Sequence, residues 1–316
     1  MQQILLVTIP FFALVLCGWT VARVGLLPLE AIPGLNVFVL FFALPCMLYR
    51  FAATTPIVRL LDPTVSTVYL LCALLLVALV LFTTRRGGVG WNDASFGALV
   101  AAFPNSGFMG VPLLVAVLGQ LAAGPAIVAL SIDMIVTSSL CIALSRLDGA
   151  NEHGVLRAVG NALAGMLKNP LPWSILLGCL TAATGFELWE PMRNTVGMLA
   201  DGATPVALFT IGAVLARPQI AAAVRGFSDA PLIVFYKLVV HPALVLGIGT
   251  MAQTVGMPLD DFSLTVLVLV AALPSASSIP MLAERFGADA GRIARIVLYA
   301  TAASFVTFSA AVALLV

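Results

Sequence analysis

Long apolar runs, separated by short polar stretches, follow one another from one end of the chain to the other. A helix that crosses a lipid bilayer needs about 20 consecutive, mostly apolar residues. Runs of that length, read with their charged, glycine and proline interruptions, predict ten membrane-spanning helices. The expected spans are residues 4–22, 32–54, 65–84, 93–118, 124–145, 169–186, 194–215, 229–252, 262–284 and 291–315. The pattern therefore predicts an all-α polytopic membrane protein.

Two of the apolar runs are interrupted in nearly the same way. Residues 100–114 read VAAFPNSGFMGVPLL and residues 270–280 read VAALPSASSIP, so VAAFPNS and VAALPSA align without a gap at an offset of 170. Proline removes a backbone donor and glycine loosens a helix, so both spans should break there. Non-helical backbone at membrane depth is tolerated only inside protein or beside a water-filled cavity. A pair of broken helices in matching halves predicts the substrate site of a transporter.

Further matches between the two halves keep an offset of 160. They are Pro10 with Pro170, Gly18 with Gly178, Gly25 with Gly185, and LPCMLY (44–49) with TPVALF (204–209). Chance recurrence of proline and glycine is the alternative, and the shared order argues against it. We expect repeats at 1–145 and 169–316, and because five spans is an odd number the second repeat should be inverted. The linker at 146–168 has apolar positions at helical spacing, which predicts an interfacial amphipathic helix.

Composition and charge support a membrane protein and suggest its orientation. Hydrophobic residues make up 61% of the chain and charged residues 9%, and the net charge of +1 gives no reason to expect a nucleic-acid partner. With the N-terminus outside, 11 of the 15 basic residues fall in cytoplasmic loops and three in outer connections. The positive-inside rule then predicts that both termini lie outside. The five cysteines lack metal-type spacing, and catalytic motifs are missing, so we expect no metal, no cofactor and no enzyme activity.

The candidate substrate contacts lie at the two breaks. They are Pro104, Asn105 and Ser106 in the first break, and Pro274, Ser275, Ser277 and Ser278 in the second. Half-helix N-termini favour an anion at such a break, whereas the opposing C-terminal ends could instead hold a cation. The alternative is a pair of kinked spans whose polar groups only satisfy each other.

Three ionisable residues inside predicted spans are further candidates, because charges in the membrane usually face the protein interior or a cavity. Lys237 and His241 are four residues apart and should share a helix face. Lys237 could attract an organic anion or pair with Asp133. His241 could carry a coupling proton, or could simply bond a backbone carbonyl freed by the proline that follows it. For Asp133 the functional and structural interpretations are equally open.

The chain resembles the auxin efflux carrier family, which includes bacterial members described as malonate permeases. The segments that carry the resemblance are PNSGFMGVPLL (104–114), LPSASSIPMLAERFG (273–287), KLVVHP (237–242), FFALPCMLY (41–49) and KNPLPW (168–173). The resemblance implies ten spans in two inverted five-helix repeats, similar to bile-acid symporters and sodium–proton antiporters, with spans four and nine crossing at Pro104 and Pro274. It also implies a scaffold of spans 1, 2, 6 and 7, a mobile core of spans 3–5 and 8–10, and a homodimer with an elevator mechanism. The crossover asparagine of the family corresponds to Asn105, but the matching position in span nine is Ser275, which argues against a plant-type auxin contact.

We therefore expect a secondary transporter of a small organic anion, malonate or a similar carboxylate, in a bacterial-type cytoplasmic membrane. Expected partners are the anion, Na⁺ or H⁺ as a coupling ion, membrane lipid and a second copy of the chain. The nearest alternative is a sodium-coupled anion symporter or a cation/proton antiporter of the same fold. An antiporter would need paired carboxylates near the crossover, and only Asp133 offers one. A channel or sensor is an alternative from a different class.

Overall fold

The structure is a computed structural model, and it describes residues 2–55, 62–147, 170–216 and 229–316 of the chain. The described residues form helices with one isolated β-bridge and no β-strand. Six helical segments are long and apolar enough to cross a membrane: Leu29–Thr54, Pro63–Arg86, Gln120–Leu144, Glu190–Leu215, Ala230–Thr254 and Ala290–Leu315. Shorter apolar helices occupy Ile9–Arg23, Ser106–Leu118, Pro170–Thr184 and Asp261–Ala272. The chain is thus an all-helical polytopic membrane protein, and the crossing of the membrane by ten spans remains a prediction.

The chain divides into two compact units. The first unit comprises Met1–Asp62, Gly107–Val128 and Asn169–Pro218, and the second comprises Pro63–Ser106, Ala129–Lys168 and Gln219–Val316. The boundary passes through the first predicted break, between Ser106 and Gly107. The division into a scaffold and a mobile core remains a prediction, and the amphipathic helix predicted within 146–168 lies outside the described residues.

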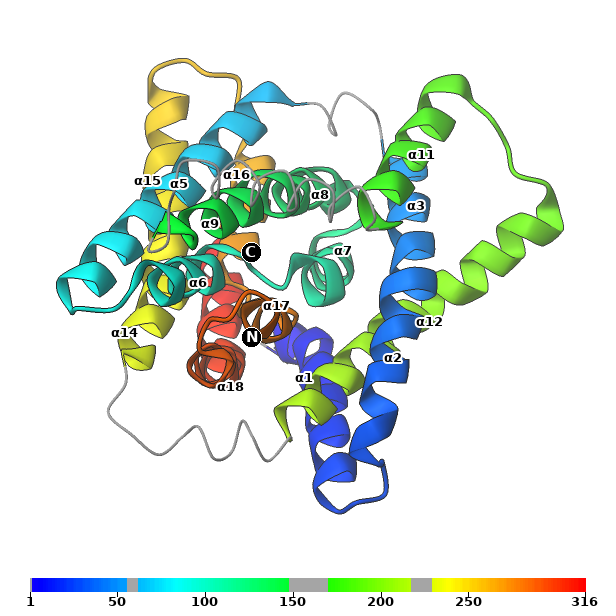
Figure 1. Cartoon of the computed structure of the whole chain (residues 1–316). Coiled ribbons are helices and arrows are strands. Elements are labelled where there is room, and N and C mark those ends of the chain that lie inside the picture. Colours follow the sequence, from blue (N-terminus) through cyan, green and yellow to red (C-terminus); the bar gives the residue numbers. More distant parts are fainter. Residues whose placement is uncertain (1, 56–61, 148–169, 217–228) are drawn as a thin grey trace. The chain divides into compact units, whose positions relative to one another are not determined.

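The first unit is built from two closely packed helix pairs. Its helices are α1 (Gln2–Arg23), α2 (Ile32–Phe38), α3 (Leu44–Thr54), α7 (Val111–Leu118), α11 (Pro170–Thr184) and α12 (Glu190–Leu215), with the start of α8 (Ala123–Ile132). A five-residue π-helical segment, Val39–Ala43, joins α2 to α3 in one continuous rod (Figure 1). The most extensive packing in this unit is that of α1 on α12 and of α11 on α3.

Glycines allow the backbones in both pairs to approach closely. A Cβ on Gly18 of α1 would collide with the carbonyl of Phe209 in α12. A Cβ on Gly178 of α11 would lie 2.6 Å from the carbonyl of Tyr49 in α3. Gly18 and Gly178 are 160 residues apart, and so are Tyr49 and Phe209. The two contacts therefore occupy equivalent positions of the predicted repeat.

The same offset relates two helix ends. Gly25 follows the end of α1 with φ +78°, and Gly185 follows the end of α11 with φ +66°. Glycine adopts this left-handed conformation at little cost, and it commonly terminates helices in this way. Both helices are therefore followed by a glycine in the left-handed conformation.

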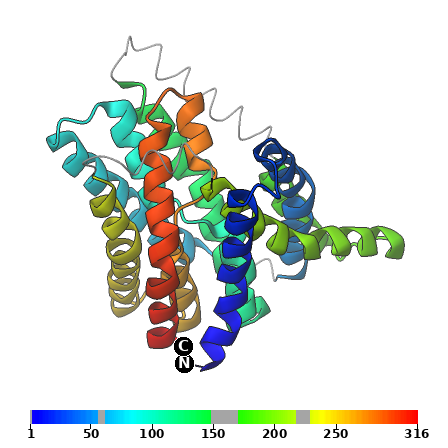
Figure 2. The same ribbon diagram turned by 90° about the horizontal axis from the view of Figure 1, so that it is seen from below.

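The second unit contains the start of the first break, up to Ser106, and the whole of the second break. Its helices are α5 (Pro63–Arg86), α6 (Trp91–Ala102), α9 (Ser138–Leu144), α14 (Ala230–Phe235), α15 (His241–Thr254), α16 (Asp261–Ala272), α17 (Ile279–Arg285) and α18 (Ala290–Leu315). Two π-helical segments interrupt it: η5 (Asp133–Thr137) lies between α8 and α9, and η7 (Tyr236–Val240) lies between α14 and α15. Figure 2 shows α18 beside the rod formed by α14 and α15, and α18 packs against α14. Single-turn π segments inside α-helices are often found at functional sites.

An arginine joins the starts of three helices in the second unit. Arg292, in the first turn of α18, donates from Nε to Oδ1 of Asp229 at 2.9 Å and from Nη2 to Oδ2 of the same carboxylate. Its Nη1 donates to the backbone carbonyl of Asp93 at 2.7 Å. The Asp93 carboxylate in turn accepts the backbone N–H of Asp289 at 2.7 Å. The starts of α6, α14 and α18 are therefore linked through one guanidinium.

Replacing Arg292 with methionine is expected to lower the free energy of unfolding by roughly 2–4 kcal/mol, because it leaves a partly buried carboxylate without its partner. The side chains of Arg292 and Asp229 are 11% and 25% exposed, so solvent screens the pair only in part. Thermal unfolding of the purified protein measures the effect. Arg285→Met, which removes an exposed arginine of α17, is the matched control and should change stability by less than about 0.5 kcal/mol. Equal effects of the two substitutions would contradict the structural role of Arg292.

Candidate functional site

The two predicted breaks meet within the second unit, which contains the first break up to Ser106 and the whole of the second. The first separates α6 from a π-helical segment at Ser106–Gly110, which leads into α7, and the second separates α16 from α17. Pro104 and Pro274 lack the N–H that would continue each helix. Pro104 and Ser275 form an antiparallel β-bridge, so the two broken stretches pair directly. We call this pairing the crossover.

Backbone hydrogen bonds on both sides hold the crossover together. The N–H of Asn105 donates to the carbonyl of Pro274 at 2.8 Å, and the N–H of Ala276 donates to the carbonyl of Phe103 at 3.0 Å. Unpaired backbone groups are expensive in a low-dielectric interior. Each break therefore supplies hydrogen-bond partners for some of the backbone N–H and C=O groups of the other.

The side chains at the crossover are not satisfied in the same way. Asn105, Ser106 and Ser275 are 3%, 0% and 1% exposed. Within the described residues, Oδ1 of Asn105 and the hydroxyl oxygens of both serines have no hydrogen-bond partner. A buried polar group without a partner costs about 1–3 kcal/mol. Other buried atoms without a partner among the described residues, such as the hydroxyl of Ser95 and Nε of Arg295, lie away from the crossover, but three of them gather at this one bridge.

The other serines of the second break lie in a different environment. Ser277 is half-buried and Ser278 is exposed. Ser278 precedes α17 as its N-cap residue, but its side chain makes no capping hydrogen bond. The structure thus groups Asn105, Ser106 and Ser275 by burial, and leaves Ser278 outside that group.

Lys237 and His241 contact each other, which confirms that they share a helix face. Both are 0% exposed. Nζ of Lys237 lies 3.2 Å from Nδ1 of His241 and donates to the carbonyl of Ala271 at 2.9 Å. Ala271 is in the last turn of α16, just before the second break. Lys237 therefore links η7 to the end of the broken helix.

Asp133 is the first residue of η5 and is 0% exposed. Its carboxylate accepts hydrogen bonds from the hydroxyl of Tyr69 at 2.7 Å and from that of Thr137 at 3.1 Å. The ring of Tyr69 also lies against that of His241, with 6.0 Å between centroids. Asp133 and Lys237 interact electrostatically, yet among the described residues they form no ion pair, so the predicted direct pairing is not observed.

Sequence reasoning did not find Tyr69. A lone tyrosine in the apolar run of α5 has the pattern of an ordinary core residue. Its hydroxyl acquires a role only through Asp133, which is 64 positions away in the chain. No local signal could have shown that contact.

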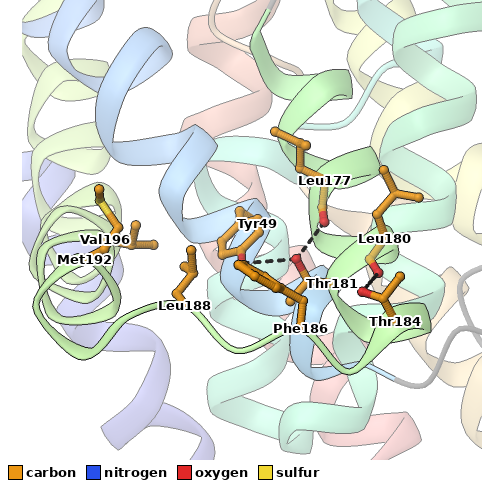
Figure 3. Close-up of a pocket in the computed structure, with 9 residues that line it drawn as sticks. All are labelled: Tyr49, Leu177, Leu180, Thr181, Thr184, Phe186, Leu188, Met192 and Val196. Atoms are coloured by element: carbon orange, nitrogen blue, oxygen red, sulfur yellow. Dashed lines mark hydrogen bonds between the residues drawn. The ribbon is translucent and has the colours of Figure 1, made fainter.

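The first unit holds a surface groove of about 450 Å³ (Figure 3). Its lining side chains come from α3, α11 and the start of α12 with the connection before it: Tyr49, Leu177, Leu180, Thr181, Thr184, Phe186, Leu188, Met192 and Val196. The three hydroxyl groups are already paired. Tyr49 and Thr181 share a hydrogen bond of 3.1 Å, and Thr181 and Thr184 donate to carbonyls of their own helix. Among the side chains that line this groove in the described residues, the apolar ones predominate and each hydroxyl is paired, so the groove is less suited to an anion than the polar crossover.

Comparison with known proteins places the chain among transporters. A family model described as "Membrane transport protein" matches residues 4–312. The chain belongs to this family, the auxin efflux carrier family. This match confirms the resemblance described from the sequence. The description of the family also agrees with the expectation that the chain is a transporter.

Relatives from bacteria, archaea and plants match most of the chain. A protein of Rhizobium meliloti (strain 1021) named "Putative malonate transporter" is 29% identical over 313 residues, which cover 97% of this chain and 94% of the relative. An "Uncharacterized transporter" of Methanothermobacter thermautotrophicus is 24% identical over 93% of this chain and 92% of its own length. "Auxin efflux carrier component 8" of Arabidopsis thaliana is 23% identical over 84% of this chain and 85% of the plant protein. Membership of the family thus extends over nearly the whole sequence.

Proposed function

We propose that this protein is a secondary active transporter of a small organic anion, malonate or a similar carboxylate, which binds at the crossover. The observation that carries the proposal is the set of buried polar atoms on Asn105, Ser106 and Ser275 that have no hydrogen-bond partner in the described part of the chain. Serine hydroxyls donate hydrogen bonds to carboxylates. The side-chain amide of Asn105 can donate as well, since flipping the amide exchanges the positions of Oδ1 and Nδ2.

The positive charge of Lys237 suits the same substrate class. Its ammonium group donates to the carbonyl of Ala271 in the last turn of α16, and Ala271 is four positions before Ser275 in the chain. A charge-assisted hydrogen bond is about twice as strong as a neutral one. The name of the Rhizobium relative supports malonate as the first substrate to test.

The remaining parts of the proposal follow from the predicted architecture. Two inverted five-helix repeats would support an elevator movement of spans 3–5 and 8–10 past spans 1, 2, 6 and 7 in a homodimer. The equivalent glycine contacts at Gly18 and Gly178 support the repeat. The distribution of basic residues supports termini on the outside, and the bacterial relative supports a cytoplasmic membrane.

The same fold could instead serve a sodium-coupled symporter or a cation/proton antiporter. Among the described residues Asp133 is the one carboxylate that is fully buried, and both of its oxygens accept hydroxyl groups. Antiport would need a second carboxylate to exchange cations, so the structure favours anion transport.

A ligand screen tests the proposal. Purified full-length protein is heated with mono-, di- and tricarboxylates, and its unfolding temperature is recorded. A ligand present at about 100 times its Kd stabilises the folded state by about 2.7 kcal/mol, so a binding anion should raise the unfolding temperature by several degrees. Malonate is expected to do so and to be taken up by proteoliposomes. Absence of a shift with every anion, together with absence of uptake, would refute the proposal.

A further inference from the structure

An exposed apolar stripe runs along one face of α5 and leads to two arginines. Its members recur at helical spacing on that face, and all of them are exposed: Leu71, Leu74, Leu75, Ala78 and Phe82. We call these five residues the α5 stripe. Arg85 and Arg86, the last residues of α5, continue the same face and are also exposed. Positions three, four and seven apart share one side of an α-helix, so the stripe and the arginines form one continuous surface.

The length of the α5 stripe matches one leaflet of a bilayer. From Leu71 to Phe82 the helix rises about 16 Å, at about 1.5 Å per residue. The hydrocarbon core of a bilayer is about 30 Å thick, so each leaflet contributes about half of that. Since Pro63–Arg86 is long and apolar enough to cross a membrane, the stripe spans the acyl layer of one leaflet and the arginines lie at its headgroups. The positive-inside rule predicts that this leaflet faces the cytoplasm.

Aromatic rings hold both arginines in place and leave their charges available. The guanidinium carbon of Arg85 lies 4.8 Å from the ring centroid of Trp91, and its Nη1 donates to the carbonyl of Val89 at 2.9 Å. The guanidinium carbon of Arg86 lies 4.0 Å from the ring centroid of Phe82. Stacking uses the face of a guanidinium, whereas its N–H donors point outward in the plane. Neither arginine forms an ion pair with a carboxylate of the described residues.

The charge around this end of α5 is positive. Residues 63–92 contain the two arginines and no other charged residue, so the segment carries a formal charge of +2. The next carboxylate along the chain, that of Asp93, accepts the backbone N–H of Asp289 at 2.7 Å. The fork of an arginine matches the oxygens of a phosphate and binds them through two parallel hydrogen bonds. The surface therefore combines an apolar length with a phosphate-binding end.

We propose that α5 binds a phospholipid whose headgroup carries a net negative charge. An acyl chain lies along the α5 stripe, and the phosphate meets Arg85 and Arg86. A lipid fits this surface better than a protein partner does, because the stripe has the length of one leaflet and its charge is confined to the headgroup end. The inference goes beyond the proposed function and holds whichever anion the protein carries.

The first arm of the test compares three ligands on the purified full-length protein in detergent. They are dioleoyl phosphatidylglycerol, dioleoyl phosphatidylcholine, which has the same chains and no net charge, and glycerol 3-phosphate, which has no chains. Phosphatidylglycerol is expected to raise the unfolding temperature by about 3 °C or more above phosphatidylcholine. Glycerol 3-phosphate should leave it unchanged, because it lacks the apolar contacts of an acyl chain. Equal effects of the two lipids would overturn the proposal, and so would stabilisation by glycerol 3-phosphate as large as that by phosphatidylglycerol.

The second arm removes the charges. Arg85→Gln combined with Arg86→Gln should abolish the difference between the two lipids and weaken phosphatidylglycerol binding, measured by native mass spectrometry, about 10-fold or more. The control combines Arg23→Gln and Arg285→Gln, which removes two exposed arginines from the ends of α1 and α17. The control should keep the difference between the lipids. An equal loss in both double variants would reduce the effect to general surface charge and overturn the proposal. If the first double variant does not fold, Arg86→Gln alone decides the same question.

The third arm tests the apolar part of the surface. Leu75→Asn places a polar group in the middle of the α5 stripe and should weaken phosphatidylglycerol binding several-fold. Leu246→Asn in α15 is the matched control, because Leu75 and Leu246 are 43% and 40% exposed. Equal lipid affinity of the two variants would overturn the proposal. A smaller oligomer in Leu75→Asn with unchanged lipid affinity, seen by light scattering, would identify the stripe as an interface between copies of the chain and would also overturn it.

Discussion

Replacing Ser275 with alanine is expected to weaken malonate binding about 10- to 100-fold while leaving the empty protein at least as stable as the wild type. A hydrogen bond to a charged group contributes about 1.5–3 kcal/mol, which corresponds to that range of affinity. Among the described residues the buried Ser275 hydroxyl has no hydrogen-bond partner, so its removal breaks no hydrogen bond within them and removes an unpaired polar group. Malonate-dependent shifts in unfolding temperature and uptake into proteoliposomes measure the two effects separately.

The neighbouring Ser278 supplies the control for this prediction. It has the same side chain three residues further along, but it is exposed and makes no capping bond. Ser278→Ala should leave both binding and stability unchanged. Asn105→Ala should resemble Ser275→Ala in direction and exceed it in size, since an amide can make more than one bond. If Ser275→Ala destabilised the empty protein and left malonate affinity intact, the hydroxyl would be structural and the site would lie elsewhere.

The largest effect on the fold is expected from Gly212→Ala. A Cβ at this position of α12 would collide with the backbone carbonyl of Val15 in α1. A carbonyl within a helix cannot rotate away as a flexible side chain can, so the two helices must separate and lose packing along their contact. We expect a loss of roughly 2–4 kcal/mol, seen as a fall of several degrees in the unfolding temperature and as reduced yield of folded protein.

The same helix provides the matched control for Gly212. Gly202 also lies in α12, and a Cβ there would meet nothing within 4 Å. Gly202→Ala should therefore be neutral, or should stabilise the protein by up to about 1 kcal/mol through helix propensity. Equal behaviour of the two substitutions would show that α1 and α12 do not approach as closely as the structure has them.

The location of the candidate site was predictable from the sequence because the signal is local. Proline, glycine and small polar residues at 104–110 and 273–280 stand out in runs that are otherwise apolar, and neither stretch can continue the α-helix that precedes it. The physical rule that freed backbone groups must find partners then predicts that two such breaks belong together. The bridge between Pro104 and Ser275 is how this chain satisfies that rule.

The sequence could not rank the polar residues within those stretches. Ser275 and Ser278 are the same residue type, but Ser275 is 1% exposed and its hydroxyl has no partner among the described residues, whereas Ser278 is exposed. Likewise, the pairing of Lys237 with Asp133 was a reasonable expectation from charge alone. Tyr69, which has no sequence signal, takes the carboxylate instead, and the end of α16 takes the ammonium.

The sequence by itself determined the class of protein, its helical segments and the two breaks, because hydropathy and the backbone chemistry of proline and glycine act over neighbouring residues. Only the tertiary structure decided which polar atoms at the crossover lack partners and where the charge of Lys237 is held. Those facts depend on contacts between residues far apart in the chain, as in the bonds from Asn105 to Pro274 and from Ala276 to Phe103, which join residues 169 and 173 positions apart. Burial and hydrogen bonding are properties of the packed chain, and no local pattern specifies them.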